Sequence, residues 1–129
     1  MLNPSTADGY KDDPTVKKCC DYAKAWEYGG IDIVNLYAFR ATDPKQLATI
    51  SDPIGPENES YLRQAIMENR ITILAWGRHG LERSRWFFEN VLMRYKFFYL
   101  KINQDGTPSH PLYLKKNLLA TPWASEMSL

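Results

Sequence analysis

The chain has 129 residues, of which 44% are hydrophobic and 24% are charged, and its net charge is +1 at pH 7. This balance is close to that of ordinary globular domains and excludes a wholly disordered chain. It predicts a single domain over residues 1–129 with enough apolar side chains for a core. The near-neutral charge argues against a dedicated DNA-binding protein, since such proteins usually carry a strong positive charge.

The cysteines and the hydrophobic runs limit which classes of protein remain possible. Cys19 and Cys20 are adjacent, and the chain has no third cysteine. Neighbouring cysteines do not readily bridge each other, and together with His79 and His110 they show no metal-ligand spacing. We therefore predict no disulfide framework, no metal and no cofactor. The sequence contains neither a signal peptide nor an apolar run of about 20 residues, which favours a cytoplasmic protein without a membrane span.

The N-terminal segment reads like the end of a strand followed by a turn. Met1 and Leu2 are apolar, and Asn-Pro-Ser-Thr-Ala-Asp-Gly follows at residues 3–9. The first strand itself is largely missing, so we expect a chain that is truncated at its N-terminus. A sheet that lacks a strand exposes an edge, and such an edge favours an oligomer formed by pairing with another chain.

Helices and strands are predicted to alternate along the rest of the chain. Asp13 followed by Pro14 is typical of a helix start, because Asp caps free amides and Pro lacks an N–H that the first turn leaves unpaired. We expect this helix to end at the glycines 29–30. The other expected elements are strands over residues 31–36, 71–76 and 96–102 and helices over residues 57–69 and 79–94. The alternation predicts a three-layer α/β/α fold with a mainly parallel four-stranded sheet.

The carboxyl ends of parallel strands share one edge of the sheet, where ligands bind in open α/β sheets. Asn35 lies inside an apolar strand, where an unpaired amide is costly, so it either braces a loop or binds a ligand. His110 stands between Ser109 and Pro111 in a stretch that limits where its ring can point, and both a structural and a functional role remain open.

Two further parts of that edge are candidates for ligand binding. Asn3, Pro4 and Ser5 form either a loop that faces the substrate or an ordinary turn. Arg78 and His79 stand where a helix is expected to begin, which favours an anion such as phosphate, because free amides point outward there. The alternative for this pair is a solvated basic helix start.

Six ordered segments resemble one bacterial and phage family. They are Met-Leu-Asn-Pro-Ser-Thr-Ala-Asp (1–8), Asp-Asp-Pro-Thr (12–15), Val-Asn-Leu-Tyr-Ala-Phe-Arg-Ala-Thr-Asp-Pro (34–44), Gly-Pro-Glu-Asn (55–58), Ala-Trp-Gly (75–77) and His-Pro-Leu-Tyr-Leu (110–114). The family is domain-of-unknown-function family sixteen-forty-three, and the resemblance covers nearly the whole chain. Its members usually have a strand and more before the Asn-Pro-Ser-Thr segment, in line with a truncated start. The family name itself conveys no activity.

A more distant resemblance is to the uracil-DNA glycosylase superfamily, especially its mismatch-specific branch. Asn3-Pro4 is similar to the motif after that fold's first strand, and Asn35 to the residue that can end its second strand. The loop Arg40-Ala41-Thr42 is similar to the loop that follows that residue in some members. The pair His110-Pro111 is similar to the His-Pro motif after the last strand of the fold. The sequence departs from the superfamily at Ser5, where glycine is usual, and it lacks the four cysteines of the iron–sulfur members.

This second resemblance implies cleavage of the N-glycosidic bond of a flipped nucleobase in DNA or a nucleotide. Asn3 would orient water, and Asn35 would bind the edge of the base. His110 would stabilise the charge on the departing base. The other implied binding residues are Pro4, Ser5, Tyr10, Tyr37, Arg40, Arg78 and His79, with Tyr10, Tyr37 or Phe39 stacking on the base. The alternatives are a non-catalytic nucleotide-binding or interaction module of the same fold, and a phosphate binder that uses Arg78.

Overall fold

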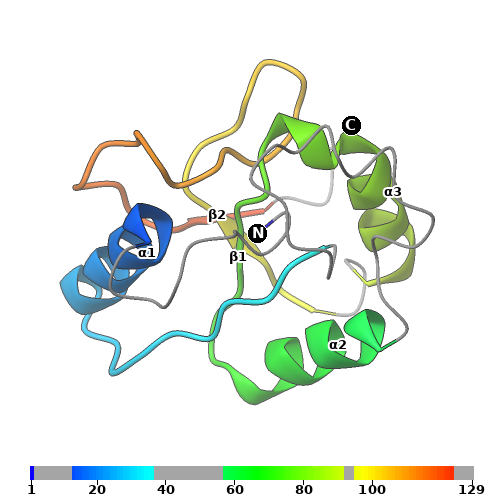
Figure 1. Cartoon of the computed structure of the whole chain (residues 1–129), viewed down its shortest axis with the longest axis horizontal. Coiled ribbons are helices and arrows are strands. Elements are labelled where there is room, and N and C mark those ends of the chain that lie inside the picture. The colour runs from blue at the N-terminus through cyan, green and yellow to red at the C-terminus, as the bar shows by residue number, and fades with distance from the viewer. Residues whose placement is uncertain (2–12, 37–56, 92–94, 124–129) are drawn as a thin grey trace.

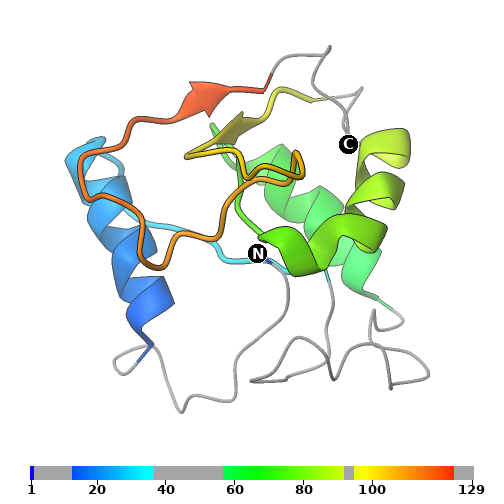
Figure 2. The ribbon, with the colours of Figure 1, turned by 90° about the horizontal axis from the view of Figure 1, so that it is seen from above.

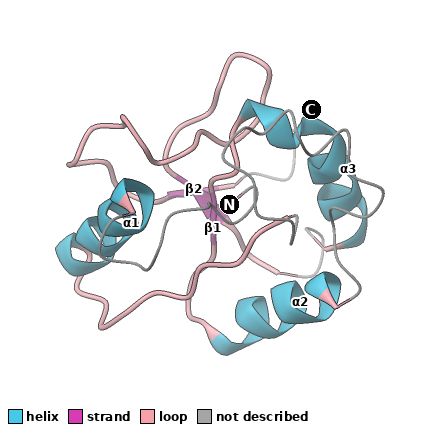
Figure 3. Cartoon of the chain, in the orientation of Figure 1, coloured by secondary structure: helices cyan, strands magenta, loops and turns pink. Residues whose placement is uncertain are grey.

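The computed structural model describes residues 1, 13–36, 57–91 and 95–123. Figure 1 shows short strands near the centre with helices around them, and Figure 3 shows that much of the described chain is loop. In chain order the described elements are α1 (Pro14–Ala25), α2 (Asn58–Glu68), β1 (Ile73–Leu74), the 3₁₀ turn η3 (Arg78–Gly80), α3 (Leu81–Asn90), β2 (Phe98–Tyr99) and β3 (Thr121–Pro122). The predicted mixed α/β class is therefore confirmed.

The helices lie on both sides of the strands. In Figures 1 and 2, α1 lies on one side of the sheet, and α2 and α3 lie on the other. On the α1 side, the Tyr22 hydroxyl donates to the Lys115 carbonyl, and Trp26 Nε1 donates to the Leu118 carbonyl at 3.2 Å. Within the described ranges, every helix is too short or too polar to cross a bilayer.

The described sheet differs from the predicted one. β1 and β2 are parallel, as expected, with Ile73 opposite Phe98. β2 and β3 are antiparallel, so the order of the described strands is β1-β2-β3. The strand β3 was not predicted, because two residues show no periodicity and Pro122 lacks an N–H for a ladder. It forms at the edge of the described sheet, where Pro is tolerated and where the Trp123 N–H donates to the Phe97 carbonyl at 2.8 Å.

Residues 31–36, predicted to form a strand, do not form a regular one. Their strand-like pairing in the described structure is with Met1. The Met1 ammonium donates to the Val34 carbonyl at 3.1 Å, and the Leu36 N–H donates to the Met1 carbonyl at 3.0 Å. These two bonds on either side of Asn35 are the pattern of a parallel pair. Within the described residues this pairing involves Met1 alone, and residues 31–36 are not part of the sheet formed by β1, β2 and β3.

The start of α1 is as predicted, but its end is not. Asp13 Oδ1 accepts hydrogen bonds from the N–H groups of Thr15 and Val16, at 2.8 and 3.2 Å. The helix ends before the expected glycines, in a turn where Glu27 has a φ of 66°. The Tyr28 N–H closes this turn by donating to the Ala23 carbonyl at 2.8 Å. This is the Schellman arrangement that glycine usually provides.

We expect Glu27→Gly to raise the free energy of unfolding by up to about 1 kcal/mol, because the left-handed backbone strains a residue that has a Cβ. Urea unfolding followed by circular dichroism measures the change. The matched control is Ala25→Gly at the last residue of α1, which should lower the free energy of unfolding by up to about 1 kcal/mol. Destabilisation by both variants would show that the turn gains nothing from glycine.

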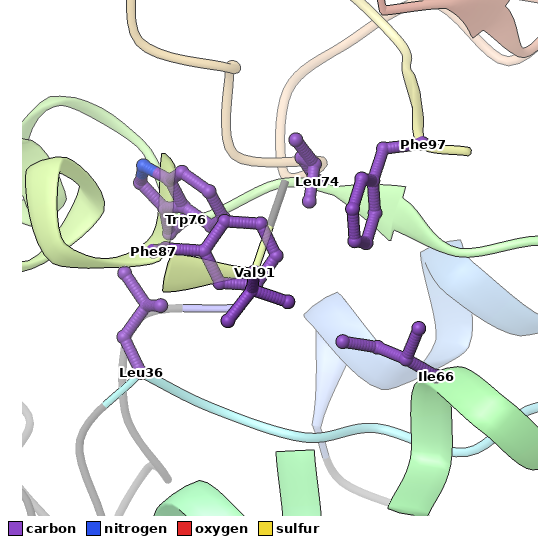
Figure 4. Packing of buried hydrophobic residues seen from close by; sticks show 7 residues of the cluster. All are labelled: Leu36, Ile66, Leu74, Trp76, Phe87, Val91 and Phe97. Carbon is purple, nitrogen blue, oxygen red and sulfur yellow. The ribbon is translucent and has the colours of Figure 1, made fainter. Parts of the chain in front are cut away.

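The core lies between β1 and the helices α2 and α3. Its cluster of buried side chains, drawn in Figure 4, consists of Leu36, Ile66, Leu74, Trp76, Phe87, Val91 and Phe97. The ring centroids of Trp76 and Phe87 are 5.3 Å apart, and those of Phe87 and Phe97 are 5.1 Å apart. Edge-to-face contacts of this kind add to the free energy gained from apolar burial. Leu36 belongs to this cluster, so the end of residues 31–36 is anchored beside the core.

Candidate functional site

Loops that follow β1 and β2 meet at one edge of the sheet. The Gly77 N–H, after β1, donates to the Pro108 carbonyl at 2.9 Å. Gly77 has a φ of 81°, and a Cβ placed on it would lie 3.4 Å from the Cβ of His110. The left-handed backbone and the close approach both favour glycine at this position. Gly77 thus allows the chain after β1 to pass directly against His110.

Met1 connects this edge to the end of residues 31–36. Its carbonyl accepts from the Leu36 N–H, and it shares the lining of one cavity with Pro111, the residue after His110. Its ammonium is also close enough to His110 to lower the pKa of the imidazole. Met1 therefore pairs with the segment that carries Asn35 and shares a cavity with the loop that carries His110.

Asn58, at the start of α2, braces the Asn35 segment. Its Nδ2 donates to the Asn35 carbonyl at 2.8 Å and to the Leu36 carbonyl at 3.0 Å. The sequence analysis did not single out this residue, although it closes the Gly-Pro-Glu-Asn segment at 55–58. Because the brace uses the backbone carbonyl of Asn35, the half-buried side-chain amide of Asn35 stays a candidate for recognition of a ligand.

The loop before His110 is held by its own polar side chains. Ser109 Oγ donates to Asn103 Oδ1 at 2.6 Å, and Asn103 Nδ2 donates to Thr107 Oγ1 at 3.0 Å. The Thr107 side chain and N–H both donate to Asp105, and these hydrogen bonds lower the pKa of that carboxyl group. Thr107 and Ser109 are buried. These hydrogen bonds therefore fix the loop that leads to His110.

The surroundings of His110 determine which ring nitrogen carries a proton and lower the pKa of the imidazole. Its Nδ1 accepts from the Leu112 N–H at 3.3 Å, which leaves the ring proton on Nε2 as a hydrogen-bond donor. Burial lowers the pKa of His110, the Met1 ammonium lowers it further, and the Asp13 carboxylate opposes them. His110 is thus a neutral imidazole at pH 7 that can donate through Nε2.

Asp13 is a member of this neighbourhood that sequence reasoning identified only as a helix cap. Its charge acts on His110 and also raises the pKa of Cys19. Burial is the largest cause of that raised pKa of Cys19, so this thiol is a weak nucleophile at pH 7. Within the described ranges, no three His, Cys, Asp or Glu side chains are grouped so that they could hold a metal ion.

Arg78 and His79 are exposed on η3, directly after Gly77. They were expected at the first turn of a helix, but they belong to the 3₁₀ turn that precedes α3. The charge of Arg78 contributes to the lowered pKa of Asp105. Arg78 therefore lies near the loop that leads to His110, and both Arg78 and His79 are open to solvent.

Several predicted site residues lie outside the described residues. They are Asn3, Pro4, Ser5, Tyr10, Tyr37 and Arg40, together with Phe39, Ala41 and Thr42. Of the three residues expected to meet at the edge, Asn35 lies in the segment that pairs with Met1, and the pKa of His110 is lowered by the charge of the Met1 ammonium. Asn3 stays a prediction, and it follows Met1 by two residues in the sequence.

Fold and site together define a mixed α/β domain with polar groups gathered where its sheet meets the loops after β1 and β2. The chain belongs to the family described as "Protein of unknown function (DUF1643)", whose family model matches residues 1–112. The first of the two resemblances is thereby confirmed. Comparisons with curated proteins and with solved structures gave no significant match.

Proposed function

We propose that the chain binds a nucleobase or nucleotide at this edge of the sheet and hydrolyses its N-glycosidic bond, as members of the uracil-DNA glycosylase superfamily do. The observation that carries the proposal is the neutral imidazole of His110. It is held by the Leu112 N–H and lies beside Met1, whose carbonyl pairs with the Asn35 segment.

In the proposed reaction, the electron pair of the N-glycosidic bond leaves with the base, and water adds to the sugar carbon. The proton that the water loses passes through solvent to the departing base. The Nε2 proton of His110 would donate to the carbonyl oxygen on which negative charge develops, as an oxyanion donor does. The Asn35 amide, which carries both donors and an acceptor, would bind the edge of the base. Asn3 would orient the water, because an amide cannot remove a proton from it.

The proposal includes the finer architecture of a four-stranded parallel sheet of the uracil-DNA-glycosylase kind. Three observations support it. β1 and β2 are parallel, Met1 is paired in parallel fashion with the segment around Asn35, and helices lie on both sides of the strands. On this proposal, Met1 marks a strand position between residues 31–36 and β1.

A second candidate is a non-catalytic module that binds a nucleotide or nucleic acid at the same edge. The net charge of +1 favours it over a DNA enzyme, because phosphate contacts supply much of the affinity for DNA. Both candidates place the chain in the cytoplasm, and both allow an oligomer formed through an open sheet edge.

The test incubates the full chain with uracil-containing and mismatch-containing oligonucleotides and counts abasic sites. We expect Asn3→Ala to lower their yield by about a hundredfold, the usual order of effect for a group that acts on the attacking water. Equal yields from both proteins would remove Asn3 from the mechanism. Salt-sensitive retention of an oligonucleotide without cleavage would select the second candidate. If the chain neither retains nor cleaves the oligonucleotide, both candidates are contradicted.

A further inference from the structure

Three side chains spaced four residues apart on α1 each donate to a backbone carbonyl of the segment that follows His110, drawn in orange beside α1 in Figures 1 and 2. The donors are Lys18, Tyr22 and Trp26, and the acceptors are, in that order, the carbonyls of Leu114, Lys115 and Leu118. Residues four apart lie on the same face of a helix, so the three contacts form one row. Tyr22 is 3% exposed, and its ring stacks on that of Trp26 with the centroids 5.4 Å apart. The middle contact is therefore the most enclosed of the three.

The short stretch of chain from His110 to Lys115 is held at both ends. Before it, the Ser109 N–H donates to the carbonyl of Lys101, which follows β2, at 2.8 Å. At its far end, the Tyr22 hydroxyl holds the Lys115 carbonyl. The two anchors belong to different parts of the fold, one to the chain after β2 and one to α1. The conformation of the stretch between them therefore depends on both.

Between these anchors the chain makes a tight turn that carries the contact to His110. The Leu114 N–H closes the turn by donating to the carbonyl of Pro111, a fully buried residue, at 3.1 Å. Tyr113 has a φ of 73°, a backbone conformation that residues with a Cβ rarely adopt and that persists where the surrounding structure holds it. Leu112 lies inside the same turn, and its N–H donates to Nδ1 of the imidazole. A change in the turn therefore moves the group that orients the ring.

We propose that Tyr22 is a positioning residue for His110. Its hydrogen bond holds the turn of residues 111–114 in the form that aims the Leu112 N–H at Nδ1 of the imidazole. Lys18 supports the same turn through its own bond to a carbonyl at the end of it. The consequence for catalysis rests on the proposed function, in which the Nε2 proton needs a fixed direction toward the departing base. The position of the ring does not depend on that function, so it is measured on the chain without a substrate.

The test compares Tyr22→Phe, which keeps the stacked ring and removes only the hydroxyl, with the unmodified chain. Hydrogen exchange by NMR follows the Leu112 amide. Mass spectrometry follows the modification of His110 by diethyl pyrocarbonate, which needs an unprotonated ring nitrogen, here the Nδ1 that the Leu112 N–H occupies. We expect both rates to rise about fivefold to tenfold, the change that follows from the loss of one hydrogen bond. His79, exposed on η3, is the internal reference and should react equally in both proteins.

Two further variants separate positioning of the ring from a general loosening of the segment. Trp26→Phe also removes one donor from the same face of α1, but its partner Leu118 lies beyond the turn, so both rates should stay within about twofold of the unmodified chain. Lys18→Met removes a donor at the turn and should raise both rates, so it decides the question if Tyr22→Phe does not fold. Rates in Tyr22→Phe that stay within about twofold of the unmodified chain, or equal rises in Trp26→Phe, would overturn the proposal.

Discussion

For the proposed cleavage of an N-glycosidic bond, we expect His110→Ala to lower the rate of base release by about a hundredfold or more, the usual effect of removing one donor to a developing oxyanion. The reason is the orientation of the ring, since the Leu112 N–H occupies Nδ1 and leaves the Nε2 proton for the base. Single-turnover assays on an oligonucleotide or nucleoside that the full chain cleaves measure the effect.

Two variants serve as controls for this prediction, one at His110 itself and one at a nearby exposed residue. His110→Gln keeps a side-chain donor and should recover part of the rate. Tyr113→Ala, at a side chain that is 92% exposed three residues away, should leave the rate unchanged. A rate for His110→Ala within a factor of about three of the full chain would exclude His110 as the oxyanion donor, since one lost donor costs far more than that.

The same assignment predicts a pH profile. Burial lowers the pKa of His110 below the ordinary value for histidine, about 6.5, so the imidazole takes up a proton at a lower pH than an ordinary histidine does. Protonation would place a hydrogen on Nδ1 and break the bond from the Leu112 N–H. The rate that depends on His110 should therefore fall on acidification with a midpoint below about pH 6.5. A rate that rises as the pH falls through that value would mean that the cationic ring is the active form.

The second large effect concerns stability. We expect Phe87→Ala to lower the free energy of unfolding by about 3–5 kcal/mol, the usual cost of truncating a buried aromatic side chain. Phe87 is 2% exposed and contacts the rings of both Trp76 and Phe97, so its removal leaves a cavity at the centre of the core. Figure 4 shows it among the other members of the cluster.

Urea unfolding followed by tryptophan fluorescence and by circular dichroism measures this change. The matched control is Tyr61→Ala on α2, because that aromatic side chain is 59% exposed and its loss should cost less than about 1 kcal/mol. Similar losses for the two variants would show that the cluster around Phe87 is not the main core of the domain.

The sequence alone determined the features that depend on neighbouring residues. Asp13 and Pro14 predicted the start of α1, and the apolar spacing after residue 57 predicted α2, because a cap and an amphipathic face are both local patterns. The resemblance carried by the ordered motifs identified the family.

Tertiary structure decided the features whose partners are distant in the chain. Residues 31–36 read as a strand, but their described pairing depends on Met1, which no local pattern places there. β3 forms because residues 97–99 offer it a partner, and its own two residues carry no strand pattern. The Asn58 brace and the contact of Gly77 with His110 likewise join separate segments. A hydrogen bond or close contact between distant residues leaves little trace in either local sequence, so only the folded chain reveals it.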